Sequence, residues 1–262
     1  MNFDWTKYKR VFAFGCSFTQ YIYPTWADII AHEIPNGEYY NFGKSGMGNL
    51  GISSRVAEAN NRFNFNETDL VLVMYSTVFR EDRYIEGNWE THGNVFNQGY
   101  YDKNFVKNYV DPTGCLIRDL SLIELSSNYV RSLPCDSLIL KGSTLEDECI
   151  YVEDQETMNT VKNLYSDMWD SFPPSLFETI RNEHWHVTAE RIVDGQSFGD
   201  THPTPIEYYD YLIKIGINLS DSTKQYAEDS ELRCHSFKQF SDWVINFPEL
   251  SELQERMDRI LF

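Results

Sequence analysis

Apolar runs of strand length recur along the chain, and helical patterns separate them. The runs at 10–14 and 69–75 are nearly free of polar residues, and shorter strand candidates lie at 38–42 and 135–142. A continuous apolar run of this length predicts a parallel strand that is buried on both faces. We therefore expect these four segments to form the core of one sheet.

Between these runs, apolar side chains recur three or four positions apart, as on one face of a helix. This spacing predicts helices over 24–34, 50–61 and 114–133, and Pro24 suits the first turn of a helix. An alternation of strand and helix predicts right-handed crossovers and a parallel sheet. The predicted fold class is α/β.

Two long insertions interrupt this alternation. Residues 79–113 are polar and aromatic without a clear period, and residues 145–185 begin as an acidic, poorly patterned segment. Insertions of this length that follow a strand are more often lids or substrate walls than ordinary loops. Within the second insertion, 159–182 has a helical pattern that is broken at 172–174.

The last part of the chain is predicted to be helical. Pro205 favours a helix start, and the spacing predicts a helix over 206–215. Residues 221–262 are expected to form a C-terminal extension of short helices. No repeat or compositional boundary divides the chain, so we expect a single domain over 1–262.

Three polar loops follow the strand candidates. One holds Ser17, the next holds Gly46, and a third holds Asp200 and His202. Parallel strands deliver the loops at their carboxyl ends to one rim of the sheet, where ligands bind. A serine hydroxyl attacks an ester when a base removes its proton and N–H groups stabilise the oxyanion. Ser17 as nucleophile, Gly46 as N–H donor, and Asp200 with His202 as orienter and base would fill these roles.

The same segments resemble a known family. Residues 15–19 (Gly-Cys-Ser-Phe-Thr), 41–49 and 200–203 are similar to blocks I, II and V of the SGNH (GDSL-like) hydrolases. The first of them is of the type common in bacteriophage and bacterial genomes, and 24–30 is typical of the family's first helix. The resemblance covers the predicted sheet core and leaves out both insertions and the tail.

The resemblance implies a flavodoxin-like, three-layer α/β/α fold and a carboxylic ester as substrate. It implies Ser17 as the nucleophile, His202 as its base, and Asp200 as the residue that orients the imidazole. The backbone N–H groups of Ser17 and Gly46 would bind the oxyanion. Neither a metal nor a cofactor is implied.

This chain departs from the family pattern at two points. Block III normally supplies an Asn side chain as a third oxyanion donor, whereas here Ser76 and Thr77 follow the strand. Three alternatives are open. A hydroxyl of Ser76 or Thr77 replaces the Asn as donor, the Asn49 side chain of the glycine loop donates instead, or the oxyanion hole has one donor fewer. Loss of one donor typically lowers turnover by about a hundredfold or more.

The second departure concerns the carboxylate beside His202. The family usually separates Asp and His by three positions, whereas Asp200 and His202 are two positions apart. A loop can absorb one residue. Asp194 is an alternative partner for the imidazole, and Asp200 would then cap the helix that begins at Pro205.

Other candidate ligands have simpler interpretations. His184 and His186 lack a third histidine nearby, so we read them as a partly buried pair flanking Trp185 rather than as metal ligands. Cys16 is read as a small core residue. Arg80 and Arg83 could bind an anionic substrate or form a salt bridge with Glu81 or Asp82.

Composition limits the partners. The 22 Lys and Arg face 40 Asp and Glu, a net charge of -18, which repels phosphate backbones and argues against nucleic acid as a partner. The five cysteines lack a zinc-like spacing and are predicted to be free thiols of a reducing compartment. Neither a signal peptide nor a membrane-spanning segment is evident, which predicts a cytoplasmic protein, or a virion-associated one if phage-encoded.

The predicted activity is that of a serine esterase on a small-molecule or glycan ester. Aromatic residues make up 15% of the chain, and a polar, aromatic insertion favours removal of O-acetyl or other short acyl groups from a carbohydrate over action on a long-chain lipid. The alternative is a weakly active or inactive binding or structural protein of the same fold, such as a phage virion component. The sequence does not set the oligomeric state.

Overall fold

The computed structural model describes residues 3–96, 101–181, 189–193, 196–200, 202–234, 245–257 and 260–261, with the backbone alone at 181, 189–193 and 196–200. A sheet of four parallel strands lies at its centre in the order β2-β1-β3-β6. These strands are β1 (Arg10–Phe14), β2 (Glu38–Asn41), β3 (Asp69–Tyr75) and β6 (Asp136–Lys141). The four predicted strand segments are confirmed, and every residue of β3 is buried, as its continuous apolar run predicted.

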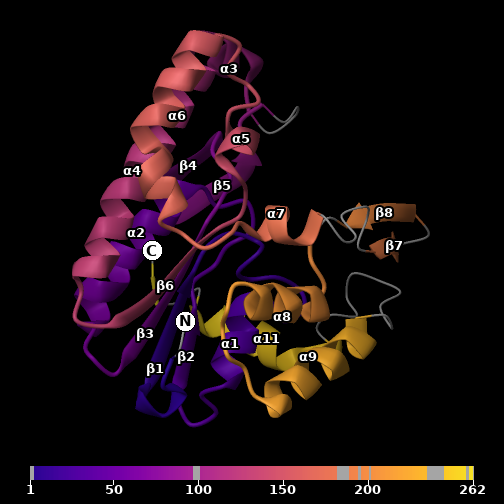
Figure 1. The fold of residues 1–262 in the computed structure, drawn as a ribbon. Helices are drawn as coiled ribbons and strands as arrows, with labels where there is room; N and C mark the ends of the chain where they lie inside the picture. The colour runs from indigo at the N-terminus through magenta and orange to yellow at the C-terminus, as the bar shows by residue number, and fades with distance from the viewer. Residues whose placement is uncertain are drawn as a thin grey trace.

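Helices cover both faces of this sheet (Figure 1). One face carries α1 (Trp26–His32), α8 (Pro205–Lys214) and α9 (Asp221–Cys234), and the other carries α2 (Asn49–Phe63), α4 (Pro112–Ser132) and α6 (Gln155–Asp170). The C-terminal α11 (Pro248–Met257) lies beside the edge strand β2. The three-layer α/β/α architecture is therefore confirmed.

Strands β1 and β3 are neighbours at the centre of the sheet, with Phe14 opposite Val73. The chain leaves β1 through α1 on one face and enters β3 through α2 on the other. The strand order therefore reverses between β1 and β3, and in sheets of this kind the crevice beyond the carboxyl ends at that point binds the ligand.

The first insertion has more regular structure than its sequence pattern indicates. It forms an antiparallel hairpin of β4 (Arg80–Ile85) and β5 (Asn88–Asn94), followed by α3 (Lys103–Tyr109). Glu86 and Gly87 form its two-residue turn with φ of 50° and 89°, the positive pair that a type I′ turn requires. The hairpin lies beyond the carboxyl ends of the sheet strands (Figure 1).

The second insertion contains the short α5 (Leu145–Glu148), then α6, and α7 (Leu176–Arg181). The predicted break at 172–174 is confirmed, whereas α6 begins at Gln155 because the Asp154 carboxylate accepts a hydrogen bond from the Thr157 N–H. Strands β7 (Ala189–Val193) and β8 (Gln196–Asp200) form an antiparallel pair that the sequence pattern did not predict. A single 3-10 turn, η1 (Trp5–Lys7), precedes β1.

All five cysteines are free thiols, as predicted, and Cys16 is fully buried in the core. Among the described helices, none is both long and apolar enough to span a bilayer. His184, His186 and Asp194 lie outside the described residues.

Candidate active site

Ser17 lies in a tight turn directly after β1. The carbonyl of Cys16 accepts hydrogen bonds from the N–H groups of Thr19 and Gln20, at 2.9 and 3.1 Å, which closes the turn. Gly15 is required here because a Cβ at this position would lie 2.0 Å from the Thr19 Oγ1 and 3.0 Å from the Met74 carbonyl. The turn therefore folds back on β1 and holds Ser17 at the rim, 7% exposed.

The glycine loop after β2 lies beside this turn. The Asn41 amide links the two segments, because its Nδ2 donates to the Thr19 carbonyl at 2.8 Å and its Oδ1 accepts from the Gly43 N–H at 3.0 Å. The Lys44 N–H also donates to the Gly15 carbonyl at 3.1 Å. Backbone and side-chain hydrogen bonds thus fix the glycine loop against the Ser17 turn.

Gly46 sits in this loop with a φ of +75°, a conformation that favours glycine. A Cβ on Gly46 would lie 2.2 Å from the Thr91 carbonyl of β5, so the residue's lack of a side chain also lets the hairpin approach. The hairpin is attached to the loop by bonds from Gly93 N–H to the Gly46 carbonyl at 3.1 Å and from Thr91 Oγ1 to the Ser45 carbonyl at 2.8 Å.

Two backbone donors at this rim are uncommitted. Within the described part of the chain, the N–H groups of Ser17 and Gly46 and the Ser17 hydroxyl take part in no hydrogen bond. Buried or half-buried N–H groups are normally paired. Two unpaired donors on adjacent loops form a suitable site for an oxyanion.

His202 lies against the Ser17 turn, although it is far downstream in the sequence. Its imidazole stacks on the ring of Tyr21, with centroids 3.9 Å apart, and lies 4.9 Å from the ring of Phe18, the residue after Ser17. The Tyr23 hydroxyl donates to the His202 carbonyl at 3.2 Å. The structure thus places the imidazole of His202 and the glycine loop that carries Gly46 each against the turn that carries Ser17.

The carboxylate partner of His202 remains a prediction. Asp200 is the last residue of β8, and its side chain, like the whole of Asp194, lies outside the described part. Thr204 and Glu207 form a capping box at the start of α8, so that helix is capped without Asp200. No hydrogen bond joins Ser17 to His202 in this structure, and hydroxyl–imidazole bonds in free enzymes often tighten only when substrate binds.

Asn49 has both of its amide hydrogens engaged. Its Nδ2 donates to the Ser76 carbonyl and to Asp119, each at 3.2 Å, while its Oδ1 accepts from the Ser76 N–H at 3.0 Å. The Ser76 hydroxyl lies 3.4 Å from the Asn49 Oδ1 and 3.3 Å from the Thr77 carbonyl. Asn49 and Ser76 therefore hold one another at the end of β3.

Thr77 differs from both. Its Oγ1 accepts a hydrogen bond from Arg80 Nε at 3.2 Å, and no other bond from its hydroxyl or its N–H reaches a described residue. Arg80 takes part in no carboxylate ion pair within the described part of the chain, and its Nη1 donates to the Met47 carbonyl at 3.0 Å. Whether Ser76, Thr77 or Asn49 donates to the oxyanion stays a prediction.

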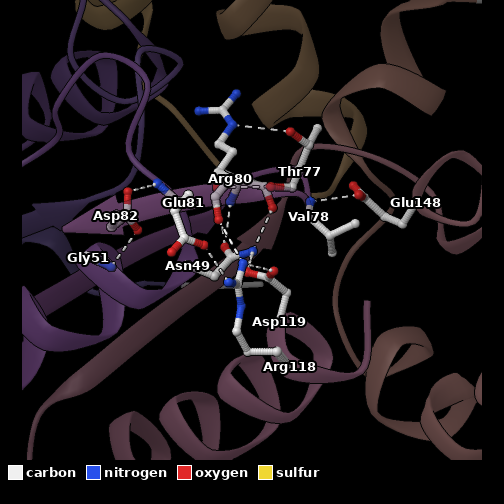
Figure 2. A network of polar contacts seen from close by, with 12 residues as sticks. Asn49, Gly51, Thr77, Val78, Arg80, Glu81, Asp82, Arg118, Asp119 and Glu148 are labelled. Atoms are coloured by element: carbon white, nitrogen blue, oxygen red, sulfur yellow. Dashed lines mark hydrogen bonds and ion pairs between the residues drawn. The ribbon is translucent and has the colours of Figure 1, made fainter. Parts of the chain in front are cut away.

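Buried acidic side chains surround this end of β3 (Figure 2). Glu148 accepts from the Val78 N–H at 2.7 Å and from the Ser143 hydroxyl. Burial raises the pKa of Glu148 from 4.5 to about 8 and that of Asp119 to about 6, the latter against the opposing charge of Arg118. Glu148 and Asp119 thus accept hydrogen bonds from this part of the structure, and among the described residues no group of three or more His, Cys, Asp or Glu side chains could hold a metal ion.

The sequence did not single out the aromatic side chains around His202 or the role of Arg80. Tyr21 and Tyr23 directly follow the Ser17 turn, and an aromatic pair beside a nucleophile candidate is a signal that could have marked them. The bonds from Arg80 to the Met47 carbonyl and from the Val78 N–H to Glu148 join segments that are distant in sequence, so no local pattern predicts them.

No protein-family model and no curated protein matches this chain. Among solved structures, it is similar to a member of the lipolytic protein G-D-S-L family from Veillonella parvula, with 15% identity over 79% of this chain and 97% of that one and a TM-score of 0.42. It is also similar to a GDSL-like lipase from Bacteroides thetaiotaomicron, with 14% identity over 86% and 90% and a TM-score of 0.40. At this level of similarity, the chemistry of the site has to be drawn from this chain's own residues.

Proposed function

We propose that this protein is a serine ester hydrolase of the SGNH type. The observation that carries the proposal is the position of the His202 imidazole, which lies against the ring of Phe18, the residue after Ser17. A base next to a serine hydroxyl, with free N–H groups on the same rim, is the arrangement that acyl transfer requires.

The proposed reaction has two halves. The Ser17 Oγ bonds to the carbonyl carbon while its proton passes to His202, and the carbonyl electron pair moves to the oxygen, which the N–H groups of Ser17 and Gly46 bind. Breakage of the ester C–O bond then sends the proton from His202 to the departing alcohol. Water repeats these steps on the acyl-enzyme, releasing the carboxylic acid and restoring Ser17. Asp200 would orient the imidazole.

The proposed substrate is a carbohydrate that carries O-acetyl or other short acyl groups. Tyr101, Phe105 and Tyr109 stack in series with centroids 6.5 and 6.1 Å apart, and Tyr109 is 79% exposed. The guanidinium of Arg83 lies 4.5 Å from the Phe105 ring. Exposed aromatic faces with polar neighbours suit a sugar, which presents an apolar face and a polar edge.

Hydrolysis of p-nitrophenyl acetate tests the catalytic part of the proposal. We expect Ser17→Ala and His202→Gln to reduce the rate to background, and Ser132→Ala to leave it unchanged. Ser132 is a matched control because it is exposed, at the end of α4, and bonded only locally to the Tyr129 carbonyl. A fluorophosphonate should label the wild-type protein on the peptide that contains Ser17.

The alternative is a binding or structural protein that keeps the fold. The absence of the family's block III Asn and of a Ser17–His202 hydrogen bond favours it. Equal hydrolysis by wild type and Ser17→Ala, together with no labelling of Ser17, would establish this alternative. Release of acetate from an acetylated oligosaccharide, compared with an acylglycerol, tests the substrate class.

A further inference from the structure

The guanidinium of Arg80 joins the two loops that flank the reacting position. Its Nε donates to the Thr77 Oγ1 at 3.2 Å, and its Nη1 donates to the Met47 carbonyl, next to Gly46, at 3.0 Å. Because the guanidinium is planar and rigid, it sets the distance between the end of β3 and the glycine loop.

Arg80 is itself held on both sides. Its carbonyl accepts from Arg118 Nη2 at 2.7 Å, and the carbonyl of the preceding Phe79 accepts from the Val95 N–H at 2.7 Å. The Val78 N–H donates to Glu148 at 2.7 Å. Arg118 of α4 and Glu148 of α5 (Figure 2), together with the Val95 N–H just after β5, therefore fix the segment that carries Thr77.

Among the three candidates for the third donor, Thr77 is the one whose hydroxyl and backbone hydrogens are donated to no described residue. The amide hydrogens of Asn49 are engaged, and the Ser76 N–H donates to Asn49. The Thr77 hydroxyl accepts from a charged donor and keeps its own hydrogen, and its N–H reaches no described partner. A hydroxyl that accepts a bond from a cation is polarised and becomes a stronger donor.

The strand register brings the segments that carry Ser17 and Thr77 to the same part of the rim. Phe14 of β1 lies opposite Val73 of β3, so the residues that follow each strand emerge side by side at the point where the strand order reverses. A Cβ on Gly15 would lie 3.0 Å from the Met74 carbonyl, which shows how closely the two strand ends approach.

We propose that Thr77 supplies the third oxyanion donor and that Arg80 is the positioning residue that aims it. This inference rests on the proposed esterase function. When the Ser17 Oγ bonds to the carbonyl carbon, the developing oxyanion accepts a hydrogen bond from Thr77, and Thr77 keeps its proton throughout. Arg80 acts on the reaction through the Thr77 hydroxyl, which it holds in place relative to the glycine loop.

The test compares kcat and KM for p-nitrophenyl acetate among Thr77 and Arg80 variants. Thr77→Val keeps the shape and removes the donor, so we expect kcat to fall about a hundredfold with KM nearly unchanged. Thr77→Ser should restore most of the rate. Thr160→Val is the matched control, because Thr160 is exposed on α6 and bonds only to the Glu156 carbonyl. Its kinetics should equal those of the wild type.

A double-mutant cycle separates positioning from a general structural role. Arg80→Gln should lower kcat in the wild type but have little further effect in Thr77→Val, because its action passes through the Thr77 hydroxyl. Additive losses would overturn the role of Arg80. If the wild type is active and Thr77→Val has the same kcat, the role of Thr77 is overturned.

These measurements distinguish failure of the Thr77–Arg80 inference from failure of the esterase proposal. If wild type and Ser17→Ala hydrolyse the ester equally, the esterase proposal and this inference both fail. If Ser17→Ala is inactive and Thr77→Val is active, only this inference fails. Unfolding midpoints of all variants are measured so that a loss of rate caused by unfolding is recognised. If Thr77→Val is unfolded, Thr77→Ala takes its place in the test.

Discussion

At the scale of the residue, buried polar side chains form hydrogen bonds with the backbone groups of the loop that follows β3. Asn49 binds both backbone groups of Ser76, and Glu148 binds the Val78 N–H. These groups leave the hydrogen-bond ladder of the sheet at Tyr75, and buried backbone groups need partners. The loop that carries Thr77 is therefore specified by side chains rather than by secondary structure.

Glu148→Gln is predicted to change the pH dependence of stability. The folded state raises the pKa of Glu148 from 4.5 to about 8, so it holds a proton that the unfolded chain releases between these values. The stability that this proton contributes is present at low pH and is lost as the pH rises through about 8, by up to about 1.4 kcal/mol per pH unit. Asp119, Asp147 and Arg80 are the charged groups that face Glu148.

Urea unfolding of wild type and Glu148→Gln at pH 5.5 and pH 8.5 measures this effect. A glutamine side chain does not ionise, so the variant should gain stability relative to wild type at the higher pH. All other titrating groups are shared and cancel in the difference. Parallel loss of stability in both proteins would show that Glu148 ionises normally in the folded state.

At the scale of the element, the hairpin β4–β5 caps the N-terminus of helix α2. Gly48 precedes α2 and has no side chain to cap it, and the carboxylate of Asp82 in β4 accepts from the Gly48 and Gly51 N–H groups, each at 2.8 Å. A negative charge at a helix N-terminus is favourable. The hairpin therefore couples the start of α2 to the glycine loop beside it.

Asp82→Ala should destabilise the fold by about 2–4 kcal/mol, because it leaves two buried N–H groups without partners. Asp111→Ala provides the comparison, since Asp111 caps α4 through the Gly114 N–H in an exposed, local arrangement. Its loss should be about 1 kcal/mol. Chemical denaturation of both variants measures the difference, and equal losses would show that the hairpin contributes no special stability to α2.

At the scale of the whole molecule, acidic residues outnumber basic ones, with a net charge of -18. Such a charge opposes the compact state through self-repulsion, and salt screens it. We expect this repulsion to outweigh the surface ion pairs, because exposed ion pairs are individually weak. The charge also favours neutral substrates over anionic ones.

Raising NaCl from 20 to 500 mM at pH 7.5 should raise the thermal unfolding midpoint by a few degrees, measured by differential scanning fluorimetry. At pH 4.6, the calculated isoelectric point, the same salt should have little effect because the net charge is near zero. A midpoint that falls with salt at pH 7.5 would mean that the ion pairs outweigh the self-repulsion.

The sequence by itself determined the four sheet strands and the α/β class, and it placed Ser17 and Gly46 in the loops that follow β1 and β2. Apolar runs and helical spacing are local signals, and the parallel topology that they imply carries the loops after β1 and β2 to one rim. The expectation that His202 also follows a strand of this sheet was wrong, because the strand before it, β8, belongs to a separate antiparallel pair. The hairpin at 80–94 was missed because its strands are half-exposed and polar, so they lack the alternation that marks a strand.

Only the tertiary structure decided which groups at the rim are free to act. Asn49 is engaged by Ser76 and Asp119, whereas Thr77 keeps its donors and receives a bond from Arg80. The sequence contains all of these residues but not their partners, which come from separate strands and helices. A donor's availability depends on what has folded around it, and that is a property of the packed molecule.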